Sequence, residues 1–138
     1  MDQKIFTVQE ANQAIPHLSR ILTKVRDRWR FLNDHSRKPA WSLEEYNIVQ
    51  EGPVSPDYFQ ALLSVRRALK EVEEIGAQVK DIPTGLVDFP ARLFGKDVLL
   101  CWRLGEAQVR FWHDLESGFA GRQPLPEPES GPGGGEGN

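Results

Sequence analysis

Residues 98–122, VLLCWRLGEAQVRFWHDLESGFAGR, decide how the second half of this chain folds. Apolar residues recur at every second position there, and Gly105-Glu106 in the middle is typical of a tight turn between antiparallel strands. We therefore expect strands over residues 98–103 and 108–114. With Gly105 and Glu106 as the two central residues of the turn, the register pairs Trp102 with Val109, Leu100 with Phe111 and Val98 with His113.

Upstream of this stretch, residues 86–93 show the same twofold alternation and predict a first strand. Two earlier segments carry apolar residues at heptad spacing, which predicts helices over residues 8–33 and 56–80. The two helices match in length and should pack against each other. We therefore expect an α+β fold, in which a long antiparallel two-helix hairpin packs on a small three-stranded antiparallel β-meander.

Capping residues mark where these helices begin. Thr7 is followed three residues later by Glu10, which predicts a capping box at the start of the first helix. Ser55 stands before a proline and an acidic residue, the order expected at the start of the second helix. A further capping box predicts a short helix over residues 43–49 in the connecting segment.

The length of the chain predicts one domain, and its charge bears on the choice of partner. The chain has 138 residues, of which residues 1–123 should form the domain and residues 124–138 a flexible tail rich in Pro, Gly and Glu. Residues 1–123 contain 17 basic and 17 acidic residues, so the net charge of -3 comes from the tail. A neutral domain argues against nucleic acid as a partner. Residues 20–38 hold seven basic and two acidic residues, which suits phosphate or nucleic acid or, as the favoured interpretation, a solvated helix end.

The single cysteine cannot form an intramolecular disulfide. No apolar run is long enough for a membrane span, and the first residues do not resemble a signal peptide. We expect a cytoplasmic protein without membrane contact.

The predicted register places Leu99, Cys101 and Trp112 on the sheet face that points away from the helices. A solvated face does not need three such apolar side chains. We expect either residues 40–54 or a second copy of the protein to cover it. In the second case these residues form an interface and the protein is a homodimer, which is the state that we expect. The leading functional hypothesis is therefore a non-catalytic interaction module that self-associates.

The chain contains no phosphate-binding loop, paired-cysteine metal signature, HExxH motif or nucleophile elbow. The remaining candidates are His113, Glu116 and Asp88, which offer a ligand set for a divalent metal such as zinc, manganese or iron. The alternative is a histidine at the edge of the core that hydrogen-bonds an acid. On the predicted register, Glu106 lies at the opposite end of the hairpin from His113 and cannot share its metal. Cys101 is interpreted as a buried, inert thiol.

Gly121 and Arg122 form a second candidate site, because backbone N–H groups and a guanidinium can together bind an anion. The alternative is that Arg122 pairs with an acid. With the metal candidates, these residues predict the rival function, a small metal-dependent or anion-binding enzyme.

Three segments, FTVQEANQAIPHL, KDIPTGLVDFPA and LLCWRLGEAQVRFWHDLESGFAGR, resemble small bacterial proteins grouped as the domain-of-unknown-function family 2203. The resemblance covers residues 6–124 and is most specific in the CWRxGE, FWH and GFAGR segments. It implies a cytosolic bacterial protein with the helix-hairpin-plus-sheet layout. It implies no activity or substrate, so the catalytic residues and the cofactor stay unknown.

Overall fold

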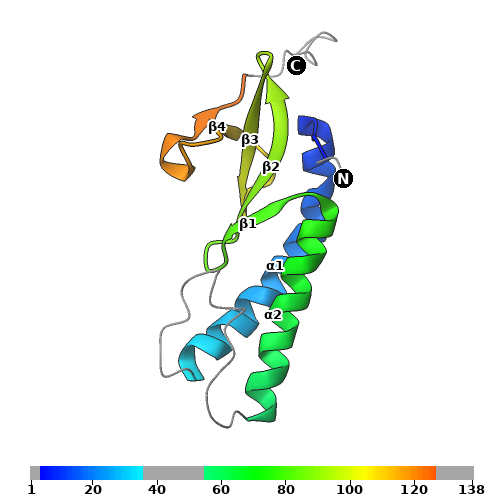
Figure 1. The fold of residues 1–138 in the computed structure, drawn as a ribbon, viewed down its shortest axis with the longest axis vertical. Coiled ribbons are helices and arrows are strands. Elements are labelled where there is room, and N and C mark those ends of the chain that lie inside the picture. Colours follow the sequence, from blue (N-terminus) through cyan, green and yellow to red (C-terminus); the bar gives the residue numbers. More distant parts are fainter. Residues whose placement is uncertain (1–3, 36–54, 127–138) are drawn as a thin grey trace.

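Two long helices and a five-stranded antiparallel sheet make up the described part of the chain (Figure 1). The computed structural model describes residues 4–35 and 55–126. The short helix predicted over residues 43–49 and most of the predicted tail lie outside these residues. Neither helix is both long enough and apolar enough to cross a membrane.

Helix α1 (Val8–His35) begins at the predicted capping box. The Thr7 N–H donates to Glu10 Oε1 at 2.9 Å, and the Glu10 N–H donates to Thr7 Oγ1 at 3.0 Å. The helix continues through Pro16. Its buried residues include Ile21 and the predicted apolar stripe: Ala11, Ile15, Leu18, Leu22, Val25, Trp29 and Leu32.

Helix α2 (Pro56–Ile75) begins where Ser55 Oγ accepts a hydrogen bond from the Tyr58 N–H at 3.1 Å. It ends at Gly76, whose φ of 108° is left-handed, so the prediction of a helix to residue 80 is wrong. The chain leaves the helix there and enters a short strand. Val79 fits the apolar stripe of a helix and the alternation of a strand equally well. The spacing of apolar residues therefore could not show that the helix ends before Val79.

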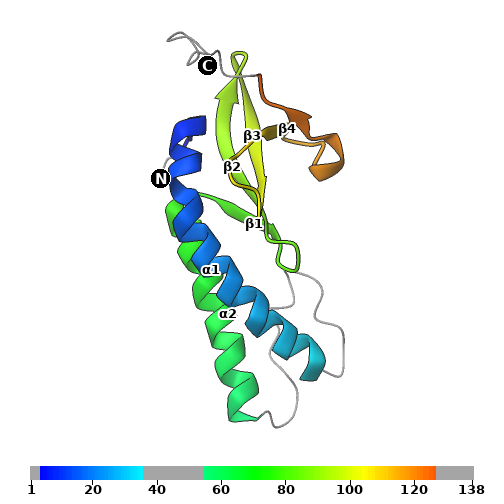
Figure 2. The same ribbon diagram turned by 180° about the vertical axis from the view of Figure 1, so that it is seen from behind.

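Helices α1 and α2 lie side by side and run in opposite directions, as the two opposite views show (Figures 1 and 2). One lateral contact joins His17 Nε2 to Glu71 Oε2 at 2.8 Å. The residues that connect the helices, 36–54, lie outside the described residues, so the complete hairpin stays a prediction.

The sheet follows chain order, with every neighbouring pair antiparallel. Three of its strands correspond to the predicted meander, and the prediction of only three strands is wrong. The first extra strand includes residues that were predicted to end the second helix. The other extra strand lies where the predicted domain meets the predicted tail. The strands are β1 (Gln78–Asp81), β2 (Leu86–Leu93), β3 (Lys96–Arg103), β4 (Phe111–Asp114) and β5 (Gln123–Pro124).

The register between β3 and β4 differs from the prediction by one residue. Leu100 lies opposite Trp112 instead of Phe111, and Leu99 lies opposite His113. The connection is longer than a tight turn, because the β3–β4 ladder ends at the pair Cys101 and Phe111. Within the connection, the Val109 N–H donates to Asn12 Oδ1 of α1 at 2.7 Å. A shift of one residue moves every β4 side chain to the other face of the sheet.

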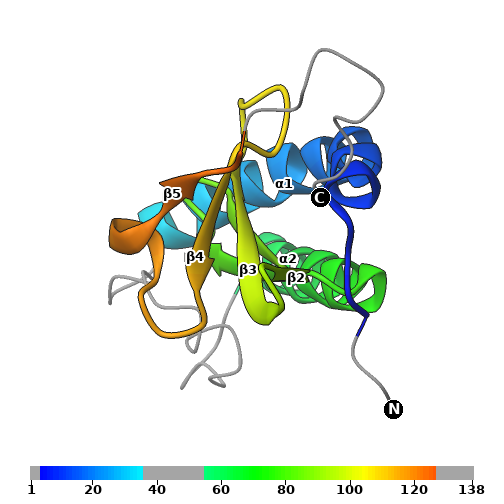
Figure 3. The same ribbon diagram turned by 90° about the horizontal axis from the view of Figure 1, so that it is seen from above.

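The corrected register separates an inner face from an outer face. The inner face joins the helices in one hydrophobic core through Val87, Phe89, Leu100, Trp102 and Trp112. Viewed from above, α2 lies near β2, and β4 and β5 form the part of the sheet that is farther from α2 (Figure 3). The outer face carries Asp88, Cys101 and His113.

Candidate metal centre

Three buried side chains from three neighbouring strands meet on the outer face. Asp88 lies on β2, Cys101 on β3 and His113 on β4. Asp88 is directly opposite Cys101, and His113 is opposite Leu99, two residues along β3 on the same face. Asp88 and His113 are each 2% exposed and are the two buried polar residues among those that the structure describes, while Cys101 is fully buried. Burial of Asp88 and His113 carries a desolvation cost, so these two groups need partners inside the protein.

The ring of His113 is held in one orientation by two contacts. Its Nδ1 lies 2.7 Å from the backbone oxygen of Asp114, and its Nε2 lies 3.2 Å from Asp88 Oδ1. A carbonyl oxygen can only accept, so Nδ1 carries the hydrogen. In the neutral ring, Nε2 is therefore an acceptor, and its contact with Asp88 Oδ1 is a hydrogen bond when the Asp88 carboxyl carries the proton.

Burial also raises the pKa of Asp88 and of Cys101, the two residues that lie next to this ring. It raises the pKa of the Asp88 carboxyl above 3.8, and the nearby His113, Lys80 and Arg122 only partly oppose this change. Burial likewise raises the pKa of the Cys101 thiol from 9.0 to about 11. Without another positive charge in the site, the thiol is protonated at neutral pH.

This arrangement does not suit a cysteine nucleophile. A nucleophilic cysteine must either be ionised to the thiolate or lie beside a histidine nitrogen that can take its proton. Here Nδ1 of His113 is bonded to the backbone, and Nε2 faces Asp88. With both of its nitrogens engaged, His113 is not placed to take the proton of Cys101, whose thiol pKa is raised.

The same arrangement suits a metal ion. One ligand atom each from Asp88, Cys101 and His113 lies within 4.8 Å of the others. Zinc–ligand distances of about 2.0–2.3 Å place the ligand atoms of a tetrahedral ion roughly 3.3–3.7 Å apart, close to the 3.2 Å between Asp88 and His113. The hydrogen bond from Nδ1 to the Asp114 backbone is the outer-shell contact that typically orients a metal-binding histidine.

A cavity of about 240 Å³ adjoins this cluster. Asp88 and His113 form part of its wall, and Lys80 and Glu116 contribute charged groups of opposite sign. Leu86, Leu99 and Leu115 supply an apolar portion of the wall. A small molecule in this cavity would therefore contact two of the three candidate ligands.

The structure brings together two of the three predicted metal ligands. Asp88 and His113 are in contact, whereas Glu116 is exposed and lines the cavity without joining the cluster. Sequence reasoning missed Cys101 as the third member. On the correct register its position opposite Asp88 identifies it, but the register that the sequence predicts places His113 on the other face of the sheet.

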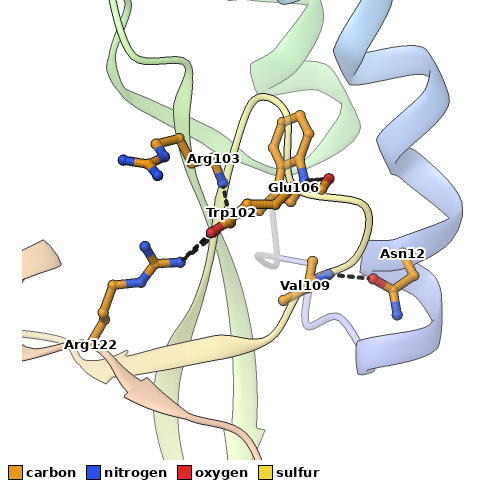
Figure 4. A network of polar contacts seen from close by, with 6 residues as sticks. All are labelled: Asn12, Trp102, Arg103, Glu106, Val109 and Arg122. Atoms are coloured by element: carbon orange, nitrogen blue, oxygen red, sulfur yellow. Dashed lines mark hydrogen bonds and ion pairs between the residues drawn. The ribbon is translucent and has the colours of Figure 1, made fainter.

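Arg122 lies beside this cluster and pairs with Glu106 (Figure 4). Its Nη2 lies 3.2 Å from Glu106 Oε2 and 3.3 Å from Oε1, and its guanidinium sits 3.9 Å from the centre of the Phe111 ring. Glu106 also accepts the Arg103 N–H through Oε1 at 2.8 Å, and its backbone oxygen accepts the indole N–H of Trp102 at 2.8 Å. Arg122 therefore supports the loop between β3 and β4, in line with the structural alternative.

Gly121 occupies a crowded position in the short 3-10 helix Phe119–Gly121. A Cβ atom there would lie 2.6 Å from Ser117 Cβ, and the Gly121 N–H donates to the Gly118 backbone oxygen at 3.0 Å. The anion-binding role predicted for Gly121 and Arg122 stays a prediction. Within the described residues, the close approach of Ser117 accounts for Gly121, and the ion pair with Glu106 accounts for Arg122.

The three predicted interface residues do not share one face. Leu99 and Cys101 lie on the outer face, but Trp112 lies on the inner face and is only 8% exposed. The Trp112 ring packs 5.5 Å from the ring of Phe94, between centroids, and the Lys96 ammonium lies 5.5 Å from its centre. The register correction thus removes Trp112 from the outer face, where the sequence placed it.

No curated protein and no solved structure matches this chain. Residues 4–125 match the profile of a family described as "Uncharacterized conserved protein (DUF2203)". The match spans both helices, all five strands and the three members of the buried cluster. The chain therefore belongs to the DUF2203 family.

Proposed function

We propose that this protein binds one divalent transition metal through Asp88, Cys101 and His113, with zinc as the best fit. The observation that carries the proposal is the convergence of an oxygen, a sulfur and a nitrogen ligand in one buried cluster. Zinc accepts all three ligand types and prefers four-coordinate geometry. A bound cation would stabilise the Cys101 thiolate and the Asp88 carboxylate, which burial otherwise disfavours.

Three protein ligands leave one coordination position for water or a small molecule. In zinc proteins, an open fourth position is typical of catalytic centres, while structural centres are closed by four protein ligands. The adjoining cavity offers space for such a molecule, and Glu116 and Lys80 are charged groups in its wall. The proposal therefore favours a metal-dependent activity over a purely structural ion.

Metal analysis of the untagged protein tests this proposal. We expect about one equivalent of zinc per chain and a rise in melting temperature when zinc is added to chelator-treated protein. Cys101→Ser and His113→Ala should each lower metal content. His17→Ala is the matched control, because His17 is an exposed histidine that pairs with Glu71 and lies outside the cluster.

Cobalt provides a second readout, which reports directly on the thiolate ligand. Cobalt bound through Cys101 should give a thiolate-to-metal charge-transfer absorption in the wild type and in His17→Ala, and none in Cys101→Ser. Less than about a tenth of an equivalent of metal, together with no thermal shift and no cobalt–thiolate absorption, would refute the proposal.

Self-association is a separate proposal, and the metal centre does not depend on it. It is supported by Leu115, which is 58% exposed and lines the outer-face cavity together with the predicted interface residue Leu99. Light scattering coupled to size-exclusion chromatography tests it. A dimer in the wild type and a monomer in Leu115→Glu would support an interface here, while a wild-type monomer at micromolar concentration would exclude it.

A further inference from the structure

A groove of about 370 Å³ runs between α1 and α2. Its walls come from the two helices alone, whereas the metal cluster lies on β2, β3 and β4. The helices lie side by side over this region (Figures 1 and 2). The floor of the groove is apolar, with the buried Ile21 and Val25 of α1 and the partly buried Ala68 of α2.

The rim of the groove is cationic. Arg20, Lys24 and Arg28 recur at every fourth residue of α1, so their attachment points follow one another at roughly 6 Å along the helix. Arg67 of α2 joins them in the lining. None of these four side chains forms an ion pair with any residue in the ranges 4–35 and 55–126.

The single acid in the lining is already engaged. Glu71 Oε2 lies 2.8 Å from His17 Nε2, and both residues belong to the groove wall. Apart from His17, four cations and one carboxylate give the lining a formal charge of about +3. Like charges at four-residue spacing repel one another on a helix, so the arrangement is destabilising until an anion neutralises it. The concave shape concentrates the positive potential above the floor.

We propose that this groove binds a small anion that carries two or more phosphate groups. Three guanidinium groups offer the forked donors that match phosphate oxygens, and Lys24 adds a compact positive charge. The volume lies within the range of small-molecule sites. The part of the lining that the structure describes contains no Phe, Tyr or Trp, so it lacks the stacking surface of a single-stranded nucleic-acid site.

Calorimetric titration with inorganic tripolyphosphate tests the proposal, using two neighbouring variants. Arg67→Gln removes a lining charge, and Arg66→Gln removes an equal charge from the exposed residue beside it, which is outside the lining. We expect Arg67→Gln to weaken binding about tenfold and Arg66→Gln to change it less than about twofold, since one charged hydrogen-bond donor is lost only in the former. Any removal of bound metal by tripolyphosphate affects both variants equally and cancels in the comparison.

Three results would overturn the proposal. Equal weakening in both variants would mean that diffuse surface charge attracts the anion. Failure of the wild type to bind tripolyphosphate at moderate salt would exclude the site itself. Tighter binding of a single-stranded oligonucleotide than of tripolyphosphate would replace the small ligand with a nucleic acid. Retention of tripolyphosphate binding in His113→Ala is expected, because the groove is separate from the metal cluster.

Discussion

Asp88 Oδ1 and His113 Nε2 lie 3.2 Å apart with β3 between their strands, and both side chains are 3% exposed. The pair is therefore excluded from water and depends on its own contacts. Because the His113 Nδ1–H is bonded to the backbone, Nε2 has one partner in the metal-free protein, and that partner is Asp88. This relationship makes the pair sensitive to substitution.

Replacement of Asp88 by alanine should destabilise the metal-free protein by about 1–3 kcal/mol, because it leaves a buried ring nitrogen without a partner. Asp114→Ala is the matched control. Its carboxylate pairs with Lys96 at 3.1 Å, but its side chain is 52% exposed, so the loss should stay below about 1 kcal/mol. Urea unfolding of both variants checks the difference, and equal losses would contradict the importance of the buried pair.

The stability of the metal-free protein should fall at alkaline pH through Cys101. Burial raises the pKa of this thiol from 9.0 to about 11, so the folded state holds its proton more tightly than the unfolded state. The resulting stability is fully present below pH 9 and is lost as pH rises through 11. The loss should approach about 3 kcal/mol, the equivalent of roughly two pKa units.

Urea unfolding between pH 8 and 11.5 measures this effect, and Cys101→Ala supplies the reference. Lysines and tyrosines titrate in the same range in both proteins, so the difference between the two curves isolates the thiol. Parallel curves would show that Cys101 keeps its ordinary pKa in the fold.

Local signals in the sequence predicted the helix starts and the long strands correctly. Thr7 with Glu10, and Ser55 before α2, are short-range chemistry that a single segment contains. Residues 86–93 coincide with β2 for the same reason, since alternation is a property of one strand. The helix starts and the strand over residues 86–93 could therefore be predicted without reference to residues far away in the sequence.

The cluster was predicted only in part, because its completion depends on a long-range contact. Asp88 and His113 were chosen for their chemistry, but the predicted register placed Cys101 and His113 on opposite faces. One contact that holds the loop before β4 joins Asn12 to Val109, across 97 residues of sequence. No local pattern in residues 98–122 contains that information, so the third member could be found only from the fold.

Asn12→Ala should loosen the loop before β4. The substitution removes the acceptor of the Val109 N–H, which lies at 2.7 Å from Asn12 Oδ1 in a partly buried site. We expect a loss of about 1–2 kcal/mol and faster hydrogen exchange at Val109. Gln13→Ala, on the exposed side of the same helix, should change neither quantity. Unchanged exchange at Val109 in Asn12→Ala would show that another contact holds the loop.

Gly85 and Gly95 provide a test of close packing between loops. Both have a left-handed backbone, with φ of 70° and 75°, so alanine costs about 1–2 kcal/mol at either position through backbone strain. A Cβ at Gly85 would also lie 2.5 Å from Leu104 Cβ, whereas nothing lies within 4 Å of a Cβ at Gly95. Gly85→Ala should therefore lose about 1–3 kcal/mol more than Gly95→Ala in urea unfolding. Equal losses would show that Leu104 moves aside freely, and that the loop before β4 is not packed firmly against the turn before β2.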